Sequence, residues 1–580
     1  MQTWKNRLIT RFKWWSKSLP FVIYLVNVAI LFTIFLPNLL DINLWDEAVY
    51  INSGRLLVEG QIKQFASSPL VSLFYGIFYL FVQKSPFWLL LADALGRFFI
   101  FTLFFSGAYL VARELSRFFN PLIMLGLLTV MPLVVEMFNF PSDPLFAALS
   151  AFTFWQVLRF YNTHQIKHLW FASLLLGLAA AARNDGLVLL PVLIVVSVIL
   201  CLPNRRWWLA ILASIVPFSI IVGGYILFAG LATGDFNPGI IERTYSNFEA
   251  GHEAIYSDPG KTNTTIEAYI EARRVFGTPE ENNYSVVTAI LRNPTVYFSR
   301  LKAVIRAFPS ILNDAYGIKF TIILLLLAAR GVIELIKRKE IKLLLVMGLW
   351  VAPLAMGFIN TIIRPGYLRF PFFIQYALAG IGLFAIVSNI KSRREVIVWL
   401  LVTILIGMLA LAAGKTAVYY GAFIFILGLL TAWYLSWRYS SEVNLQPILL
   451  LVFLCAGLVV HGNYPGPKKW QLGVNGDEAA SLYMSQSLPK DSMVLAGTPA
   501  AVWMARLEYA GLNSADLPTF ADDIEFGRWV YQNFDAIYID HSISPYYLEM
   551  IEKRIGKEFL RVFAAEGGDY QILLVIPPGH

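Results

Sequence analysis

Asp46 and Glu47 are two adjacent carboxylates that stand just after an apolar run, residues 20–38, which is long enough to span a membrane. Carboxylates are costly to place in lipid, so we expect this pair to face water or a lined cavity. In such a place one carboxylate could take the proton of an attacking hydroxyl. The alternative is structural: Asn43 could cap a short helix, whose first turn favours negative charge.

Other ionisable residues stand close to the ends of apolar runs far along the chain. They are Arg97, Glu136, Asp143, Arg183, Asp185, Asp314, Arg364 and Arg369. Arginines bind phosphate through forked donors, so acids and arginines gathered at one membrane face would suit an anionic, lipid-attached substrate. Structural interpretations stay open: Arg183 and Asp185 could cap helix ends, Asp143 could open a helix, and the last two arginines could anchor at the interface.

The composition places these residues in a membrane protein. Of 580 residues, 57% are hydrophobic and only 14% are charged, and the mean hydropathy is +0.62. Soluble domains carry about 25% charged residues, and the repeated apolar runs predict a polytopic α-helical membrane protein. The net charge of +8 does not indicate a nucleic-acid partner, because most Lys and Arg residues fall in short loops between apolar runs. Neither the two cysteines nor the six histidines have the spacing of a metal site.

The basic residues also orient the chain. The N-terminal segment is basic and no small-residue cleavage site follows the first apolar run, so we expect an uncleaved first span with its N-terminus inside. The apolar run 69–82 is short for a crossing and suits an interfacial helix. With that assignment Arg113, Arg117 and the later basic clusters all fall inside, whereas a crossing would put them all outside. The charge distribution therefore favours the interfacial helix.

About thirteen spans are predicted in this way. They cover residues 20–38, 88–112, 120–138, 144–161, 169–182, 186–202, 207–229, 317–336, 341–360, 367–389, 395–413, 417–437 and 446–461. The odd number sends the C-terminus outside. Residues 1–461 are thus expected to form a transmembrane domain, with a first external loop at 39–86 and a large external loop at 230–315. Residues 462–580 are expected to form a small extracytoplasmic α/β domain.

The two larger hydrophilic parts have patterns of their own. In the large loop, residues 297–310 predict an amphipathic helix on the membrane surface, with Arg300, Lys302 and Arg306 along it. In the tail, helix-like stretches alternate with short strand-like runs, which is typical of an α/β domain. Helices are expected at 478–488, 524–533 and 545–555, and strands at 493–496, 536–539 and 571–576.

The order of these features resembles the GT-C superfamily of polyprenyl-phosphate-sugar-dependent glycosyltransferases, and within it the branch of protein O-mannosyltransferases and lipid A aminoarabinose transferases. In that family the first span is followed by an external loop with an Asp-Glu pair, a tyrosine and a small-residue/Arg segment. Here these are Asp46-Glu47, Tyr50 and Ser53-Gly54-Arg55. The resemblance covers residues 20–390 in order and topology, and the tail more weakly.

Shorter motifs add to the resemblance. In the family a Pro-Leu step precedes the interfacial helix, and Pro69-Leu70 matches it here. An alanine-x-x-arginine motif opens the second span of the family, and residues 94–97 match that motif. An acidic residue at the fourth span is matched by Asp143, an Arg-x-Asp-Gly step by residues 183–186, and an Arg-Tyr step loosely by residues 364–369.

Two departures from the family pattern concern the donor and acceptor contacts. Close relatives have a basic residue or a histidine just before the Pro-Leu step, and residues 65–68 offer none. The Arg-Tyr step is interrupted by Pro365-Gly366. A phosphate contact expected from the family is therefore missing, or is supplied by Arg97, Arg55 or Arg364.

The resemblance implies transfer of one sugar, with inversion, from a polyprenyl-phosphate donor (undecaprenyl or dolichyl phosphate) to an acceptor on the outer face. It implies that Asp46 acts as the base and that Glu47 positions the acceptor or the base. The candidates for binding the donor phosphate are Arg97, Arg364, Arg55 and Arg183. The candidates for a second acidic group, an acceptor contact or a metal contact are Asp143, Asp185, Tyr50 and Tyr367.

The expected partners are the lipid bilayer, the lipid-phosphate-sugar donor, and a glycan, lipid or protein acceptor. A divalent cation, Mg²⁺ or Mn²⁺, is compatible with this chemistry but not required, because arginine alone could balance a leaving phosphate. The expected location is the plasma (inner) membrane, with several spans, the N-terminus in the cytoplasm and the C-terminal domain outside.

Three alternatives stay open. A transporter or flippase for a lipid-linked saccharide would carry charges near the membrane midplane, where this chain has few. A polysaccharide ligase of a sibling branch would use arginines of the large external loop, for which Arg243, Arg273 and Arg274 are available. A non-catalytic subunit of an envelope-assembly complex would not need the Asp46-Glu47 pair.

Overall fold

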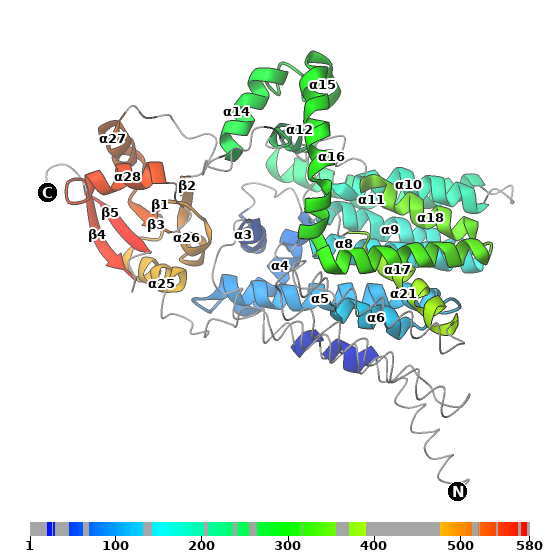
Figure 1. Ribbon diagram of the computed structural model, residues 1–580. Coiled ribbons are helices and arrows are strands. Elements are labelled where there is room, and N and C mark those ends of the chain that lie inside the picture. The colour runs from blue at the N-terminus through cyan, green and yellow to red at the C-terminus, as the bar shows by residue number, and fades with distance from the viewer. Residues whose placement is uncertain are drawn as a thin grey trace, which may run out of the picture. The chain divides into compact units, whose positions relative to one another are not determined.

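The computed structural model shows a mainly helical protein with one small sheet (Figure 1). It describes residues 20–25, 27–29, 46–61, 69–130, 142–201, 207–234, 236, 240–252, 255, 264–316, 318–354, 370–389, 476–512, 520, 522–540, 543, 545–565 and 570–576. The chain divides into two compact units. The helical unit is formed by Met1–Phe35, Phe98–Phe228 and Leu301–Gly466, and the mixed unit by Leu36–Arg97, Ala229–Arg300 and Pro467–His580.

The helical unit is built from long apolar helices. It contains α6 (Pro121–Val130), α8 (Ser142–Thr163), α9 (Lys167–Ala182), α10 (Asp185–Cys201), α17 (Ile318–Lys337), α18 (Ile341–Val351), η3 (Ala352–Leu354) and α21 (Phe372–Asn389), and the larger part of α5 (Trp88–Glu114), α11 (Trp207–Thr233) and α16 (Pro294–Tyr316). Helix α8 packs against α9, which packs against α10, and α17 packs against α21. Predicted spans therefore correspond to helices wherever the structure describes them.

Buried serines tie three of these helices together. The Ser173 hydroxyl of α9 donates to the Ser214 carbonyl of α11 at 2.6 Å, and the hydroxyls of Ser197 in α10 and Ser214 lie 2.8 Å apart. All three side chains are fully buried. Interhelical hydrogen bonds of this kind are common between helices whose surroundings are apolar, as in membranes.

Two helices within the described residues are long and apolar enough to cross a membrane: α5, and residues Trp207–Leu231 of α11. The other apolar helices in the described part of the chain are shorter. The first predicted span is described only at 20–25 and 27–29, and the last three predicted spans lie outside the described residues. The count of thirteen spans and their placement in a membrane stay predictions.

The mixed unit begins with α3 (Asp46–Val58) and α4 (Pro69–Val82), which pack against each other. One face of α4 is buried, including Tyr75 and Tyr79. Its other face exposes Leu73, Ile77 and Phe81. The spacing of these three residues forms an apolar stripe along one side of a helix, as expected for the predicted interfacial helix.

The large loop folds into helices around a small core of its own. It contains α12 (Ile240–Ala250), α14 (Thr264–Phe276), α15 (Val286–Arg292) and the start of α16. The core consists of Tyr245, Phe248, Phe276, Ala289 and Tyr297. The predicted amphipathic helix at 297–310 is part of α16, but Arg300 is fully buried rather than on a membrane-facing surface with Lys302 and Arg306. The expectation for Arg300 is wrong because Phe248 and Phe276 cover its guanidinium.

Residues 477–575 form a C-terminal α/β subdomain. Its elements are α25 (Asp477–Ser487), β1 (Met493–Ala496), α26 (Ala500–Met504), β2 (Glu508–Gly511), α27 (Asp523–Asn533), β3 (Ala536–Ile539), α28 (Pro545–Arg554), β4 (Phe559–Ala564) and β5 (Gln571–Val575). The strand order is β2-β1-β3-β5-β4. Strand β1 pairs in parallel with β2 and β3, while β5 pairs antiparallel with β3 and β4.

Helices cover both faces of this sheet (Figure 1). Val494 and Ala496 pack with Ala480 and Met484 of α25 and with residues of α26. Leu495, which points to the opposite face because strand side chains alternate, packs with α27 and α28. The three helices and three strands predicted for the tail are confirmed, whereas β2, β4 and α26 were not predicted.

Candidate functional site

Asp46 and Glu47 are the first two residues of helix α3. The structural alternative placed them in the first turn of a short helix, and this placement agrees with α3. Asn43, the cap in that alternative, and the side chains of Asp46 and Glu47 lie outside the described residues. Tyr50 is one turn further along and is 5% exposed.

Helix α3 is held in place by a close crossing with α4. A Cβ on Gly54 would lie 2.4 Å from the Ser72 carbonyl oxygen and 2.6 Å from the Gly76 nitrogen. A Cβ on Gly76 would lie 2.9 Å from the Gly54 carbonyl oxygen. The two helices can approach this closely only with glycine at both positions, which explains the small residue of the Ser-Gly-Arg segment.

Arg55 is turned towards Trp88. Its Cζ lies 5.6 Å from the centre of the Trp88 ring, and it donates to Asn52 Oδ1 at 3.0 Å and to Glu59 Oε2 at 3.3 Å. Burial lowers the pKa of Arg55, and the Glu59 carboxylate opposes this shift. Glu59 also accepts a hydrogen bond of 2.5 Å from the Tyr79 hydroxyl. These contacts connect Arg55 to α4 and α5, and its phosphate contact stays a prediction.

Arg97 lies in a fully formed ion pair within α5. Its Nε is 2.7 Å from Asp93 Oδ2, and both side chains are only 2% exposed. The Tyr75 hydroxyl of α4 donates to the other Asp93 oxygen at 3.3 Å. Gly96 leaves room for that tyrosine, because a Cβ there would lie 2.3 Å from Tyr75 Cε1. The arginine is therefore held in one orientation by a carboxylate that sequence analysis did not single out.

In the helical unit the structure brings together Asp143, Arg183 and Asp185. Arg183 follows the last residue of α9 and forms ion pairs with Asp143 in the first turn of α8 and with Asp185, the first residue of α10. One guanidinium thus bridges two carboxylates, which leaves a net charge of −1 on the three groups. This charge suits an acceptor better than it suits a phosphate anion.

Arg364 and Tyr367 lie outside the described residues. Asp46, Tyr50, Arg55 and Arg97 belong to the mixed unit.

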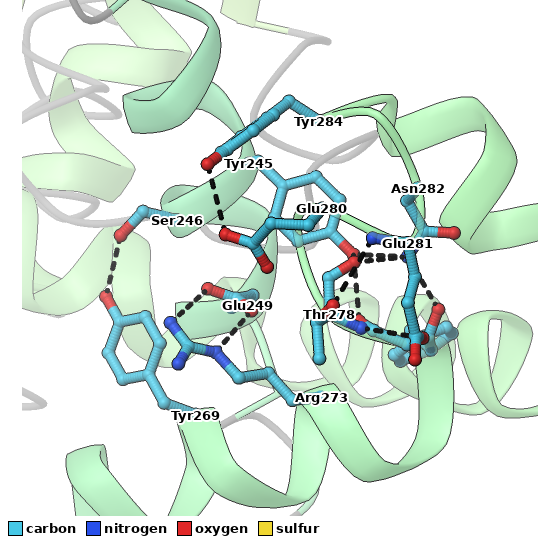
Figure 2. A network of polar contacts seen from close by, with 12 residues as sticks. Tyr245, Ser246, Glu249, Tyr269, Arg273, Thr278, Glu280, Glu281, Asn282 and Tyr284 are labelled. Atoms are coloured by element: carbon cyan, nitrogen blue, oxygen red, sulfur yellow. Dashed lines mark hydrogen bonds and ion pairs between the residues drawn. The ribbon is translucent and has the colours of Figure 1, made fainter.

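Arg273 and Arg274 of the large loop form ion pairs inside that loop, and Figure 2 shows the pair of Arg273 with Glu249. The side chain of Arg243 lies outside the described residues. Arg273 Nε lies 2.9 Å from Glu249 Oε1, and the Arg273 side chain is half exposed while that of Glu249 is 3% exposed. Burial raises the pKa of Glu249, and Arg273 opposes this shift. Arg274 pairs in the same way with Glu271, at 2.5 Å.

A second cluster in the loop surrounds Arg300, and sequence analysis missed it. The Arg300 guanidinium stacks over Phe248 at 4.5 Å and over Phe276 at 5.2 Å, and it donates to the Phe248 carbonyl. Burial lowers the pKa of Arg300 to about 10. Burial, and then the charge of Arg300, lower the pKa of the neighbouring His252 to about 4. His252 is therefore uncharged at neutral pH.

No group of three or more His, Cys, Asp or Glu side chains within the described ranges could hold a metal ion. Asp143 and Asp185 share Arg183 as their counter-ion. Two carboxylates that share one guanidinium do not fit a divalent cation.

The fold is similar to that of two proteins of known structure. ArnT from Cupriavidus metallidurans in the apo state has a TM-score of 0.54 at 14% identity, with 96% of this chain and 98% of that chain covered. The same protein bound to undecaprenyl phosphate has a TM-score of 0.53 at 14% identity and the same coverage. The oligosaccharyltransferase of Archaeoglobus fulgidus, in complex with Zn and sulfate, has a TM-score of 0.51 at 14% identity, with 97% and 74% covered.

The likeness to these solved structures confirms the fold that the resemblance implied. These identities are low, and the likeness establishes the fold rather than the substrate. No protein-family model and no curated protein matches the sequence.

Proposed function

We propose that this protein is a membrane-embedded glycosyltransferase that moves one sugar from a polyprenyl-phosphate donor to an acceptor at the outer face of the plasma membrane. The observation that carries the proposal is the GT-C fold, which extends over 96% of the chain. One of the neighbours with this fold binds undecaprenyl phosphate. The helix that begins with Asp46 and Glu47 supplies carboxylates at the position where the family pattern has them.

In the proposed reaction, an acceptor hydroxyl attacks the anomeric carbon of the donor sugar. The new bond from the acceptor oxygen to the anomeric carbon forms as the bond from that carbon to the phosphate oxygen breaks. The hydroxyl proton passes to Asp46, and the electron pair of the broken bond leaves on the lipid phosphate, with inversion at the anomeric carbon. Glu47 and Tyr50 orient the acceptor.

The leaving phosphate needs positive charge, and stabilising a developing anion is often the largest catalytic contribution. Arg97 is our first candidate because Asp93 and Tyr75 already fix its orientation. Arg364 is the second. For Arg183 we propose a different role from phosphate binding, because it is held between two carboxylates: it keeps Asp143 and Asp185 in place for the acceptor.

The ligase alternative is weakened by the loop arginines. Arg273 and Arg274 are paired with Glu249 and Glu271, and Arg273 serves the packing of α14 on α12. A ligase that uses these arginines would have to break those pairs. A flippase and a non-catalytic subunit both predict that no sugar is transferred, which the following experiment tests.

The experiment is transfer by the purified protein, reconstituted in vesicles with a panel of labelled polyprenyl-phosphate monosaccharides. We expect release or transfer of one sugar. Asp46→Asn should lower the rate by about 10²–10⁴-fold, the usual contribution of a general base. Asp491→Asn, which changes an exposed carboxylate of the C-terminal subdomain in the same way, should leave the rate unchanged. Full activity of the Asp46→Asn protein would falsify the assignment of the base.

A further inference from the structure

The C-terminal α/β subdomain contacts the first-loop helices through one corner of its sheet. Helix α26 packs against α3, and the chain then turns through Arg506 into strand β2. All of these residues belong to the mixed unit. The corner is therefore next to the helix that begins with Asp46 and Glu47.

Trp88 is the centre of this contact. Its side chain is fully buried, and its indole N–H donates to the carbonyl oxygen of Met504, the last residue of α26, at 3.2 Å. Its ring meets Tyr79 of α4 edge to face at 5.1 Å and lies under the guanidinium of Arg55 of α3. A single side chain thus contacts α3, α4 and the C-terminal subdomain.

Arg506 makes the second contact, from an unusual backbone conformation. Its φ is 64°, in the left-handed region that favours glycine. Here its amide donates to the Trp503 carbonyl and the next amide to Val502, so it closes the end of α26 as a glycine commonly does. A glycine would adopt this backbone conformation with less strain. The presence of arginine at this position therefore has to be explained by the contacts of its side chain.

That explanation lies in what the Arg506 guanidinium binds. It donates to the carbonyl oxygen of Gln83, the first residue after α4. Carbonyls at the C-terminal end of a helix lack partners within the helix and attract positive charge. Arg506 therefore caps α4, the helix against which α3 packs.

The charges around this corner are balanced. The charge of Arg506 disfavours the charged form of Arg55, while the charges of Glu59 and Glu508 favour it. Arg55 lies in the last turn of α3 and Glu59 directly follows that helix, whereas Arg506 and Glu508 belong to the C-terminal subdomain. The contact thus combines two charges of each sign with one buried indole.

Helix α3 has 13 residues, and helices of this length are marginal in isolation. Gly54 fixes one side of it on α4, and the corner at α26 supports it further. We propose that the C-terminal subdomain holds α3 in its working position through Trp88 and Arg506, which act as positioning residues for Asp46 and Glu47. This inference rests on the proposed transferase function for its consequence, but the contact itself does not depend on it.

The test uses the intact protein in lipid and two measurements, the hydrogen exchange of the α3 amides and the transfer rate. Arg506→Gly removes the guanidinium while relieving the backbone, and Trp88→Phe removes the indole N–H while keeping an aromatic ring. We expect each to speed exchange in α3 by about tenfold, as loss of one buried hydrogen bond predicts. We also expect each to lower kcat more than it raises KM for the donor.

Two further variants make the result specific. Arg506→Lys keeps the charge near α4 and should restore part of both effects. Lys339→Gly is the matched control, because Lys339 also has a positive φ of 60° but belongs to the helical unit, between α17 and α18. It should change neither α3 exchange nor the transfer rate.

The outcomes separate the two proposals. Unchanged α3 exchange in both Arg506→Gly and Trp88→Phe overturns the positioning role, whatever happens to the rate. Faster α3 exchange with an unchanged kcat overturns it as well, because the contact would then not matter to the site. If the wild-type protein transfers no sugar from any donor but α3 exchange responds, the contact stands and the proposed function fails.

Discussion

At the residue scale, the buried ion pair between Asp93 and Arg97 means that removing either charge alone should strongly lower the free energy of unfolding. Both side chains are 2% exposed, and removing one charge of a buried pair leaves the other without compensation. We expect Asp93→Asn to destabilise the protein by about 3–5 kcal/mol. Thermal unfolding in detergent measures this loss.

The double variant Asp93→Asn/Arg97→Met removes both charges and should regain much of the lost stability. If Arg97 binds the donor phosphate, the double variant should stay at least about 10²-fold slower in transfer, the usual loss of one electrostatic donor. A stable double variant with the wild-type rate would show that Arg97 is structural. A double variant as unstable as Asp93→Asn alone would show that the two charges do not compensate each other.

The same pair shows how far the sequence reaches at this scale. Asp93 stands four residues before Arg97 in one apolar stretch, and this spacing is a recognisable sign of an ion pair on one helix face. The Tyr75 contact could not be predicted, since it depends on how α4 crosses α5. The same holds for Trp88, whose partner Met504 is 416 residues away.

At the element scale, the tail shows what local patterns decide. Strands β1, β3 and β5 are runs of apolar residues in the middle of the sheet, and the sequence predicts them. Strand β2 consists of Glu508-Tyr509-Ala510-Gly511, which includes poor strand formers, and β4 carries Arg561. Both are edge strands, so pairing with a neighbour rather than composition makes them strands. Arg300 was misplaced for a similar reason, because its cover comes from α12 and α14.

His252 gives the loop helices a dependence on pH. Its pKa is about 4 in the folded loop and 6.5 when exposed, so the unfolded loop binds the proton more tightly. The stability that uncharged His252 contributes to the folded loop is therefore fully present above pH 6.5 and is lost as the pH falls towards 4. The charged groups around His252 are Arg300 of α16 and Glu271 of α14. Nearby Glu249 of α12 has a raised pKa, so its contribution to the stability of the loop falls as the pH rises. This is opposite to the contribution of His252, which rises with pH.

Hydrogen exchange of α12 and α16 between pH 4 and pH 7, corrected for intrinsic exchange rates, measures this effect. We expect the loop to open more readily at the acid end. His252→Asn should flatten the dependence, and Glu249→Gln should steepen it by removing the opposing contribution. A His252→Asn protein with the wild-type pH dependence would show that another group is responsible.

At the scale of the whole molecule, the GT-C fold includes the tail as well as the long helices. The likeness to ArnT covers 96% of this chain and 98% of that one, so the C-terminal subdomain is part of the shared fold. The sequence predicts this arrangement only weakly beyond residue 390, since the resemblance there rests on order rather than on motifs. The contacts of Trp88 and Arg506 give the subdomain a structural reason to belong with the first loop.

The predicted orientation of the chain rests on its basic residues and can be tested at two positions. The turn at Lys337-Arg338-Lys339 should face the cytoplasm, because basic clusters stay on that side, and Asp491 should face outward with the tail. In a protein without its native cysteines, Asp491→Cys should react with a membrane-impermeant maleimide in intact spheroplasts. Lys339→Cys should react only after permeabilisation. Both positions are exposed, so a difference in labelling between them reports the side of the membrane on which each lies. Labelling of Lys339→Cys in intact spheroplasts would contradict the predicted topology. It would also contradict the placement of Asp46 on the outer face, which depends on that topology.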